Sequence, residues 1–236
     1  GDFAALPGAI VDVADCLDWM PQTLGRLAPR RNSYFVLGNH DLRVGDEGRL
    51  RRMLVEAGLV DLGGRAVRYD GLAQTVEFAG NELPWFTPAG DFRRVEQRRP
   101  TEDDEQPRPL RVVLAHCPDQ FAWARRFEAD LMLAGHTHGG QIRVPVLGAI
   151  FMPSRYGTKY DCGVFYKPPT VMHVSRGLSA LTPLRLNCPP EMTRIVLRSP
   201  VALPNKQRAQ ATAHQLINAL EGIEPSPNDV DVPASG

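Results

Sequence analysis

Short apolar runs that end at a glycine or a polar residue recur along the first 140 residues of the chain. Tyr34–Leu37, Arg111–Ala115 and Leu131–Ala134 have the length and composition of strands buried on both faces. Two segments between these runs, Arg49–Ala57 and Gln120–Phe127, have the apolar spacing that is typical of helices. This alternation of strands and helices predicts an α/β fold.

Other segments predict shorter elements. Residues 11–28 place apolar side chains on one face and predict an amphipathic helix, which Pro21 kinks or divides. Leu59–Leu62 predicts a short strand, and Ala66–Phe78 alternates around a central turn as a β-hairpin does. Beyond residue 138 the pattern becomes all-β. The strands expected there are Gln141–Val144, Gly163–Tyr166, Val171–Ser175, Arg185–Asn187 and Met192–Leu197.

One segment of the domain is too polar for a packed core, and another segment lies beyond the domain. Pro88–Pro109 is rich in charged residues and proline, so we expect a solvated loop, and its arginines are read as surface charge rather than as a phosphate clamp. Lys206–Leu220 has a helical composition and is followed by a Pro, Ser and Asn-rich stretch. We therefore expect one domain over residues 1–198 and, over 199–236, a C-terminal helix with a disordered tail.

Composition narrows the class of protein. The chain has 236 residues, of which 43% are hydrophobic and 23% charged, which is enough for one α/β domain with its own core. The net charge is zero, so no basic field predicts binding to nucleic acid. Four widely spaced cysteines favour free thiols over a zinc ribbon or a disulfide framework. No apolar run approaches the length of a membrane-spanning helix.

Polar side chains with metal-binding chemistry follow three of the predicted strands. They are Asn39, His40 and Asp41 after the first, His116 after the second, and His136 and His138 after the third. Imidazole, carboxylate and amide oxygen are suitable ligands for manganese, iron or zinc. A single histidine is usually structural, but this ordered series at strand ends predicts a metal centre at one edge of the sheet.

These motifs resemble the calcineurin-like metallophosphoesterases. Gly38–Asp41, His116 and Gly135–His138 match three successive blocks of that family's pattern, and the resemblance extends from residue 1 to about residue 198. The continuation Gly139-Gly140-Gln141 is similar to a bacterial membrane-associated branch that includes YkuE-like phosphodiesterases and lipid A pathway pyrophosphatases. Further similarity to that branch lies in Arg155–Tyr160, Ser175–Gly177 and Cys188–Glu191.

The resemblance implies a two-sheet sandwich flanked by helices (αββα), in which the strands after residue 138 form the second sheet. The family's first block, an Asp-x-His, is absent, so the fold is expected to lack its first two strands. Gly1-Asp2 then stands for the family's Gly-Asp block.

The same resemblance implies a centre for two divalent ions of manganese, iron or zinc. Asp2 would bridge the two ions, and Asn39, His116 and His136 would complete one site. The second site keeps only Asp2 and His138, so a single site looks complete. A hydroxide shared by the ions would attack phosphorus in line.

His40 would act as the general acid in that reaction, and Asp41 would orient its imidazole. Tyr156, Lys159 and Arg176 could line the substrate entrance, with structural roles equally open. Glu82 and Trp85 could form part of the pocket wall, although no residue pattern supports this.

The expected activity is hydrolysis of a phosphodiester or pyrophosphate bond, and the resemblance allows a substrate linked to lipid or to nucleotide. Membrane association would come from an N-terminal segment missing here, with a location in the cytoplasm or at the bacterial inner membrane. A catalytically impaired scaffold or interaction protein of the same fold is the alternative, and a simple single-metal module is a third hypothesis.

Overall fold

The computed structural model describes residues 2–27, 32–72, 74–86, 88–95, 108–179 and 184–198. It divides into two compact units, Gly1–Met192 and Thr193–Gly236, which are described separately. In the second unit residues 193–198 are described, and they form no helix or strand. The predicted helix at Lys206–Leu220 and the predicted tail lie outside the described residues.

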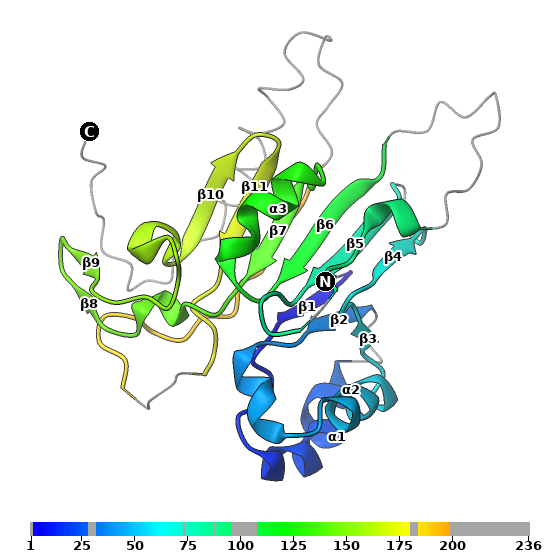
Figure 1. Ribbon diagram of the computed structural model, residues 1–236, viewed down its shortest axis with the longest axis horizontal. Coiled ribbons are helices and arrows are strands. Elements are labelled where there is room, and N and C mark those ends of the chain that lie inside the picture. Colours follow the sequence, from blue (N-terminus) through cyan, green and yellow to red (C-terminus); the bar gives the residue numbers. More distant parts are fainter. Residues whose placement is uncertain are drawn as a thin grey trace, which may run out of the picture. The chain divides into compact units, whose positions relative to one another are not determined.

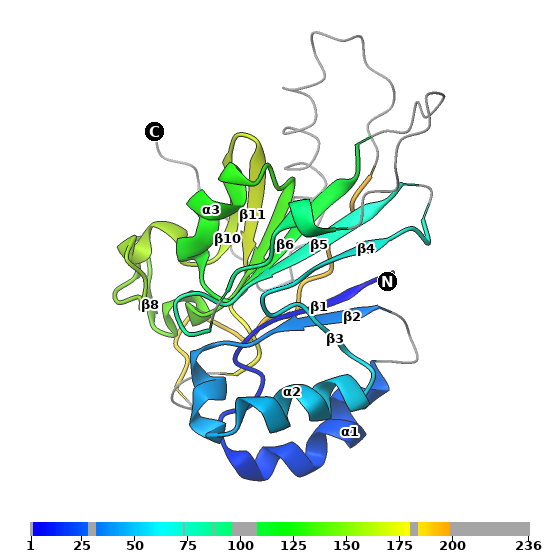
Figure 2. The same ribbon diagram turned by 45° about the vertical axis from the view of Figure 1, so that its right-hand side comes forward.

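A parallel sheet of three strands, in the order β1-β2-β3, opens the first unit. Its strands are β1 (Ala4–Pro7), β2 (Ser33–Val36) and β3 (Val60–Asp61). Helical segments cover one face of this sheet (Figure 2). They are η1 (Ala14–Trp19), α1 (Met20–Thr23), η2 (Leu24–Arg26) and α2 (Glu47–Glu56), so the helix predicted over residues 11–28 is divided into short pieces.

A second sheet has six strands in the order β10-β11-β7-β6-β5-β4 (Figure 1). They are β4 (Ala66–Tyr69), β5 (Val76–Asn81), β6 (Leu110–Ala115), β7 (Leu131–Ala134), β10 (Gly163–Lys167) and β11 (Thr170–Val174). β4 and β5 form the predicted hairpin, and β5, β6, β7 and β11 run parallel. The helix α3 (Phe121–Arg126) packs Phe121 and Ala124 against this sheet.

Aromatic side chains fill the space where the two sheets face each other. The Tyr34 ring of β2 stacks on the Phe78 ring of β5 with centroids 4.2 Å apart, and Phe3 packs edge-on against Phe78 at 5.0 Å. Helices lie outside the pair of sheets on both sides (Figure 2). The predicted αββα sandwich is therefore confirmed.

The expectation that the strands after residue 138 form the second sheet is wrong. β10 and β11 belong to the same sheet as β7, because the fully buried β11 pairs in parallel with β7. The partner sheet is instead built from β1 to β3, and β1 was not predicted. β8 (Arg143–Val144) and β9 (Gly148–Ala149) form a separate hairpin.

Two other predicted strands do not form. Leu186 makes a single bridge to Ile142 rather than a strand over Arg185–Asn187, and Met192–Leu197 has no regular structure. The remaining short helices are η4 (Asn39–Val44), η5 (Phe92–Arg94), η6 (Pro118–Gln120), η7 (His138–Gly140) and η8 (Gly157–Tyr160). Within the described ranges, no helix is long and apolar enough to cross a bilayer.

Candidate metal centre

The carboxyl ends of strands from both sheets meet at one edge of the sandwich. In the first sheet Pro7 of β1 is level with Val36 of β2, and in the second Ala115 of β6 is level with Ala134 of β7. The loops that leave these strand ends carry Asn39, His116 and His136. The sequence prediction that these three residues converge is supported by the fold.

Three side-chain atoms form a compact triangle at this edge. The amide oxygen Oδ1 of Asn39 lies 2.8 Å from Nε2 of His116 and 3.1 Å from Nδ1 of His136, and the two ring nitrogens are 3.1 Å apart. Ligand atoms at right angles and about 2.1 Å from a metal ion are about 3.0 Å from each other. The triangle therefore has the dimensions of one face of an octahedral site.

The outer nitrogens of both rings donate to backbone carbonyls. His116 Nδ1 donates to the carbonyl of Pro7 at 2.8 Å, and His136 Nε2 donates to the carbonyl of Pro153 at 2.9 Å. The inner nitrogens therefore present lone pairs toward each other and toward the Asn39 oxygen. Three acceptors that face one another repel, and a cation between them removes the repulsion. Backbone carbonyls that fix the ring tautomer are a common support for histidine ligands.

Burial keeps these rings neutral. Desolvation lowers the pKa of His116 to about 3, with His136 adding to the effect, and desolvation also lowers the pKa of His136. Neutral imidazole is the form that binds metal. The ring of Trp85 packs against both histidine rings, with centroids 5.1 Å from His116 and 4.8 Å from His136. Trp85 therefore limits how far the two rings can rotate.

The backbone around the third block is unusual. Five of the six residues from His136 to Gln141 have positive φ, and three of them are not glycine: His136 (70°), His138 (51°) and Gln141 (55°). Each such residue costs about 1–3 kcal/mol, and such conformations cluster at functional sites. This strain is a second, independent observation that marks the loop as functional.

Two glycines allow the backbone to pass close to His116. A Cβ atom on Gly8 would lie 2.5 Å from Nδ1 of His116, and a Cβ on Gly38 would also lie 2.5 Å from the same ring. Both positions therefore exclude a side chain.

The general-acid candidate, His40, has a different partner from the one expected. Its Nδ1 lies 3.0 Å from Oδ1 of Asp12, which also contacts Arg43. The Asp41 carboxylate instead accepts backbone N–H groups of Ile10 (2.9 Å), Val11 (2.8 Å) and Gly38 (2.7 Å). The prediction that Asp41 orients His40 is therefore wrong. Asp41 joins the loop after β1 to the loop after β2.

His138 lies beside His40, with ring centroids 6.0 Å apart. Desolvation, with Arg185 as the next contribution, lowers the pKa of His138 to about 4. The structure thus places His138 at the same edge as the three donors.

Comparison with known proteins agrees with this geometry. Residues 8–140 match the family described as calcineurin-like phosphoesterase. This chain belongs to the calcineurin-like phosphoesterase family. Members of that family generally use divalent metal ions, and in the described part of this chain no group of three His, Cys, Asp or Glu side chains is arranged to hold one. The triangle has two imidazoles and an amide oxygen as its third donor.

Individual relatives cover different parts of the chain. The chain is 36% identical over 176 residues to phosphodiesterase YaeI of Escherichia coli K12. This match covers 74% of the chain and 61% of YaeI. It is 39% identical over 89 residues to the uncharacterized metallophosphoesterase YkuE of Bacillus subtilis, a match that covers 37% of the chain and 31% of YkuE. It is 28% identical over 228 residues to a transmembrane protein with metallophosphoesterase domain of Danio rerio, a match that covers 81% of the chain and 46% of that protein.

The chain thus spans less than two thirds of the length of these relatives. No solved structure matches it significantly.

The calcineurin-like phosphoesterase match begins after Asp2, and the structure does not bring Asp2 to the centre. Because β1 is parallel to β2, Asp2 precedes the strand and lies at its amino end, roughly 20 Å of extended chain before Ala9. The end of β1, which is level with the strand end that precedes Asn39, is followed by Gly8-Ala9. Asp2 is therefore not a ligand, and the expected bridging carboxylate has no counterpart there.

Ala9 itself has φ 52°, a left-handed conformation that Asp and Asn adopt more readily than Ala. The backbone at residue 9 therefore suits an aspartate better than the alanine that is present.

Several features of the site were not predicted with these roles. They are Asp12 beside His40, Trp85 against the two ligand rings, the Pro7 and Pro153 carbonyls that accept from these rings, and Ala9 with its left-handed backbone. Glu82 is structural, since it accepts from the backbone N–H of Leu37 and from Arg51. Arg176 pairs with Glu191 at 2.6 Å. The Arg176 pair gives no direct support to a role at the substrate entrance.

Proposed function

We propose that this protein hydrolyses a phosphodiester or pyrophosphate bond with one bound divalent ion. The observation that carries the proposal is the triangle of acceptor atoms from Asn39, His116 and His136, whose outer ring nitrogens are fixed by backbone carbonyls. Two imidazoles and an amide oxygen suit manganese, iron or zinc. The preference for a diester is supported by the name of the relative YaeI.

When bound, such an ion would supply Lewis acidity toward a phosphoryl oxygen and lower the pKa of a nearby water. The chain's own contribution is the proton for the leaving oxygen. Nδ1 of His40 lies 3.0 Å from Oδ1 of Asp12, so Asp12 would orient the ring and Nε2 would be the nitrogen that delivers the proton. Trp85 and the carbonyls of Pro7 and Pro153 hold the ligand rings in place.

Manganese-dependent hydrolysis of bis-p-nitrophenyl phosphate by the full chain tests this proposal. His40→Ala should lower kcat by roughly 10²- to 10⁴-fold, since general acid catalysis contributes about that much. Its metal content should be unchanged, whereas Asn39→Ala should lose bound manganese. His214→Ala, at a histidine outside the family match over residues 8–140, is the matched control. Wild-type protein that binds manganese yet leaves diester and pyrophosphate substrates intact would exclude the hydrolase.

A second candidate is a catalytically impaired scaffold of the same fold. One observation favours it: Asp2, the expected bridging carboxylate, lies before the amino end of β1, and the strand end beside the three donors carries Ala9. Folded protein that stays inert with manganese, iron and zinc in turn would support the scaffold, and turnover that depends on His40 would exclude it.

A further inference from the structure

An uncharged segment of the first unit exposes large apolar side chains to solvent. From Val144 to Pro153 the chain has no charged residue. Four side chains around the β8–β9 hairpin are exposed by 67% to 101%. They are Val146 (101%), Leu147 (79%), Ile150 (67%) and Phe151 (77%). Single exposed apolar residues are ordinary, but four within six positions form a patch.

A second apolar strip extends this patch at the base of the hairpin. Leu186 bridges Ile142, and backbone bonds join it to Gln141 and Arg143. Leu184 and Leu186 are 57% and 54% exposed, whereas the intervening Arg185 donates to several backbone carbonyls, Gly177 and Cys188 among them. Alternate side chains of this segment therefore point outward and inward, and the outward ones are apolar. We call the six residues Val146, Leu147, Ile150, Phe151, Leu184 and Leu186 the hairpin patch.

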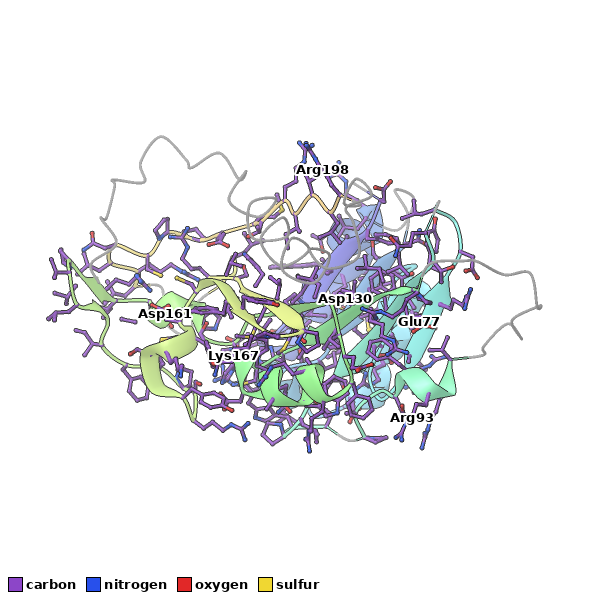
Figure 3. All side chains as sticks on the ribbon, turned by 90° about the horizontal axis from the view of Figure 1, so that it is seen from above. Glu77, Arg93, Asp130, Asp161, Lys167 and Arg198 are labelled. Carbon is purple, nitrogen blue, oxygen red and sulfur yellow. The ribbon has the colours of Figure 1, made fainter. Side chains whose placement is uncertain are left out.

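The chain segment that carries most of the hairpin patch contains basic residues and no acidic ones. Residues 142–160 contain Arg143, Arg155 and Lys159 and no acidic residue. Asp161, labelled in Figure 3, pairs with Arg143 at 2.6 Å and neutralises it. Arg155 and Lys159 are exposed, and the Asp119 carboxylate accepts from the backbone N–H of Arg155, which leaves Lys159 as the cation without an acidic neighbour in the segment. An apolar tip that is followed along the chain by exposed basic residues complements a surface that is apolar inside and anionic outside.

We propose that the hairpin patch docks this protein on an anionic lipid bilayer. Amphipathic surfaces bind such bilayers through buried apolar area together with attraction to anionic headgroups. A second copy of the chain is the less suitable occupant, because a stable protein interface uses about 20–30 residues on each side and the patch has only six. Figures 1 and 2 show the β8–β9 hairpin at one end of the first unit, far from β4.

The hairpin patch is directly connected to the candidate metal centre. Pro153, two residues after Phe151, accepts from the ring of His136. The next residues, Ser154 and Arg155, bond to Asp119, which lies three positions after His116. A bilayer that held the hairpin would therefore lie close to the edge where the three donors meet. The proposal itself does not depend on hydrolytic activity.

Co-sedimentation of the full chain with lipid vesicles tests the proposal. The probes are vesicles of phosphatidylcholine alone and of phosphatidylcholine with added phosphatidylglycerol. We expect binding that is stronger to the anionic vesicles and that weakens with salt. Leu147→Ser with Phe151→Ser should reduce the partition coefficient by roughly tenfold or more, because two large apolar side chains are removed from the contact.

A matched control removes two exposed apolar side chains elsewhere, Trp19 (65%) and Val55 (50%), as Trp19→Ser with Val55→Ser. This control should bind as wild type does, and all three proteins should have the same thermal unfolding temperature, since every changed side chain is exposed. Absence of binding to either vesicle, or equal losses in both double variants, would overturn the proposal. So would a wild-type dimer that the Leu147 and Phe151 changes dissociate, because the occupant would then be a second copy.

Discussion

Glu82→Ala is expected to lower the free energy of unfolding of the first unit by about 3 kcal/mol. Only 2% of the Glu82 side chain is exposed, and its carboxylate accepts from Arg51 at 2.6 Å and from the backbone N–H of Leu37. Removing one partner of a buried pair costs about 3–5 kcal/mol because the other charge stays buried. The lower end applies here, since Arg51 keeps Asp61 and Glu47 as partners.

A loss of that size lowers the unfolding temperature by about 6–12 °C for a unit of this length. Calorimetry and urea titration measure it. Glu47→Ala is the matched control, because Glu47 binds the same arginine but its own side chain is 48% exposed. Its loss should lower the free energy of unfolding by less than about 1 kcal/mol. Glu82→Gln should lie between the two, since its amide oxygen still accepts from Leu37.

The Glu82→Ala change should also affect metal binding at the candidate centre. Leu37 precedes Gly38 and Asn39, so loosening its backbone should weaken manganese binding at temperatures where the variant is still folded. Equal and small effects of Glu82→Ala and Glu47→Ala would refute the reasoning, because the buried pair would then contribute no more than an exposed one.

Three further outcomes follow from the centre. Ala9→Asp should raise manganese affinity by roughly tenfold in calorimetric titration, because it adds a carboxylate where the backbone already suits aspartate; unchanged affinity would place residue 9 away from the ion. Asp12→Asn should lower kcat at unchanged metal content, and loss of metal instead would make Asp12 a structural residue. In chelator-treated protein, stability should fall as pH falls from about 6.5 toward 3. Over that range His116 of the unfolded chain binds a proton that the buried His116 of the folded chain does not. The free energy of unfolding should therefore change with a slope approaching about 1.4 kcal/mol per pH unit, and His138 adds in the same direction. Urea midpoints that are equal at pH 5 and pH 7 would contradict this.

Much of the fold could be predicted because its strands are marked by local apolar runs. The bounds of Leu131–Ala134 agree with β7, and Tyr34–Leu37 differs from β2 by one residue at each end. β1 was missed because Ala4-Ala5-Leu6-Pro7 is short and weakly apolar, and its parallel pairing with β2 gives the segment its structure. The assignment of strands to sheets failed where order along the chain differs from order in space, as with β11 beside β7.

For the site too, the residues that follow a recognisable strand could be predicted and the long-range contacts could not. Asn39, His116 and His136 were predicted because each directly follows a recognisable strand. Asp2 was chosen without a strand to orient it, and β1 places it at the opposite end. The pairing of Asp12 with His40 joins residues 28 positions apart across two loops, so no local pattern reveals it. The Pro153 carbonyl is a backbone group, and sequence carries no signal for which carbonyl meets a histidine ring.

The three donors come from different sheets. Asn39 follows β2 in the first sheet, whereas His116 and His136 follow β6 and β7 in the second. A bound ion would therefore act as a cross-link between the two halves of the sandwich, comparable to a removable disulfide. A ligand present at 100 times its Kd stabilises the folded state by about 2.7 kcal/mol. The free metal concentration around this protein would then set its lifetime against unfolding and proteolysis, independently of any chemistry performed at the centre.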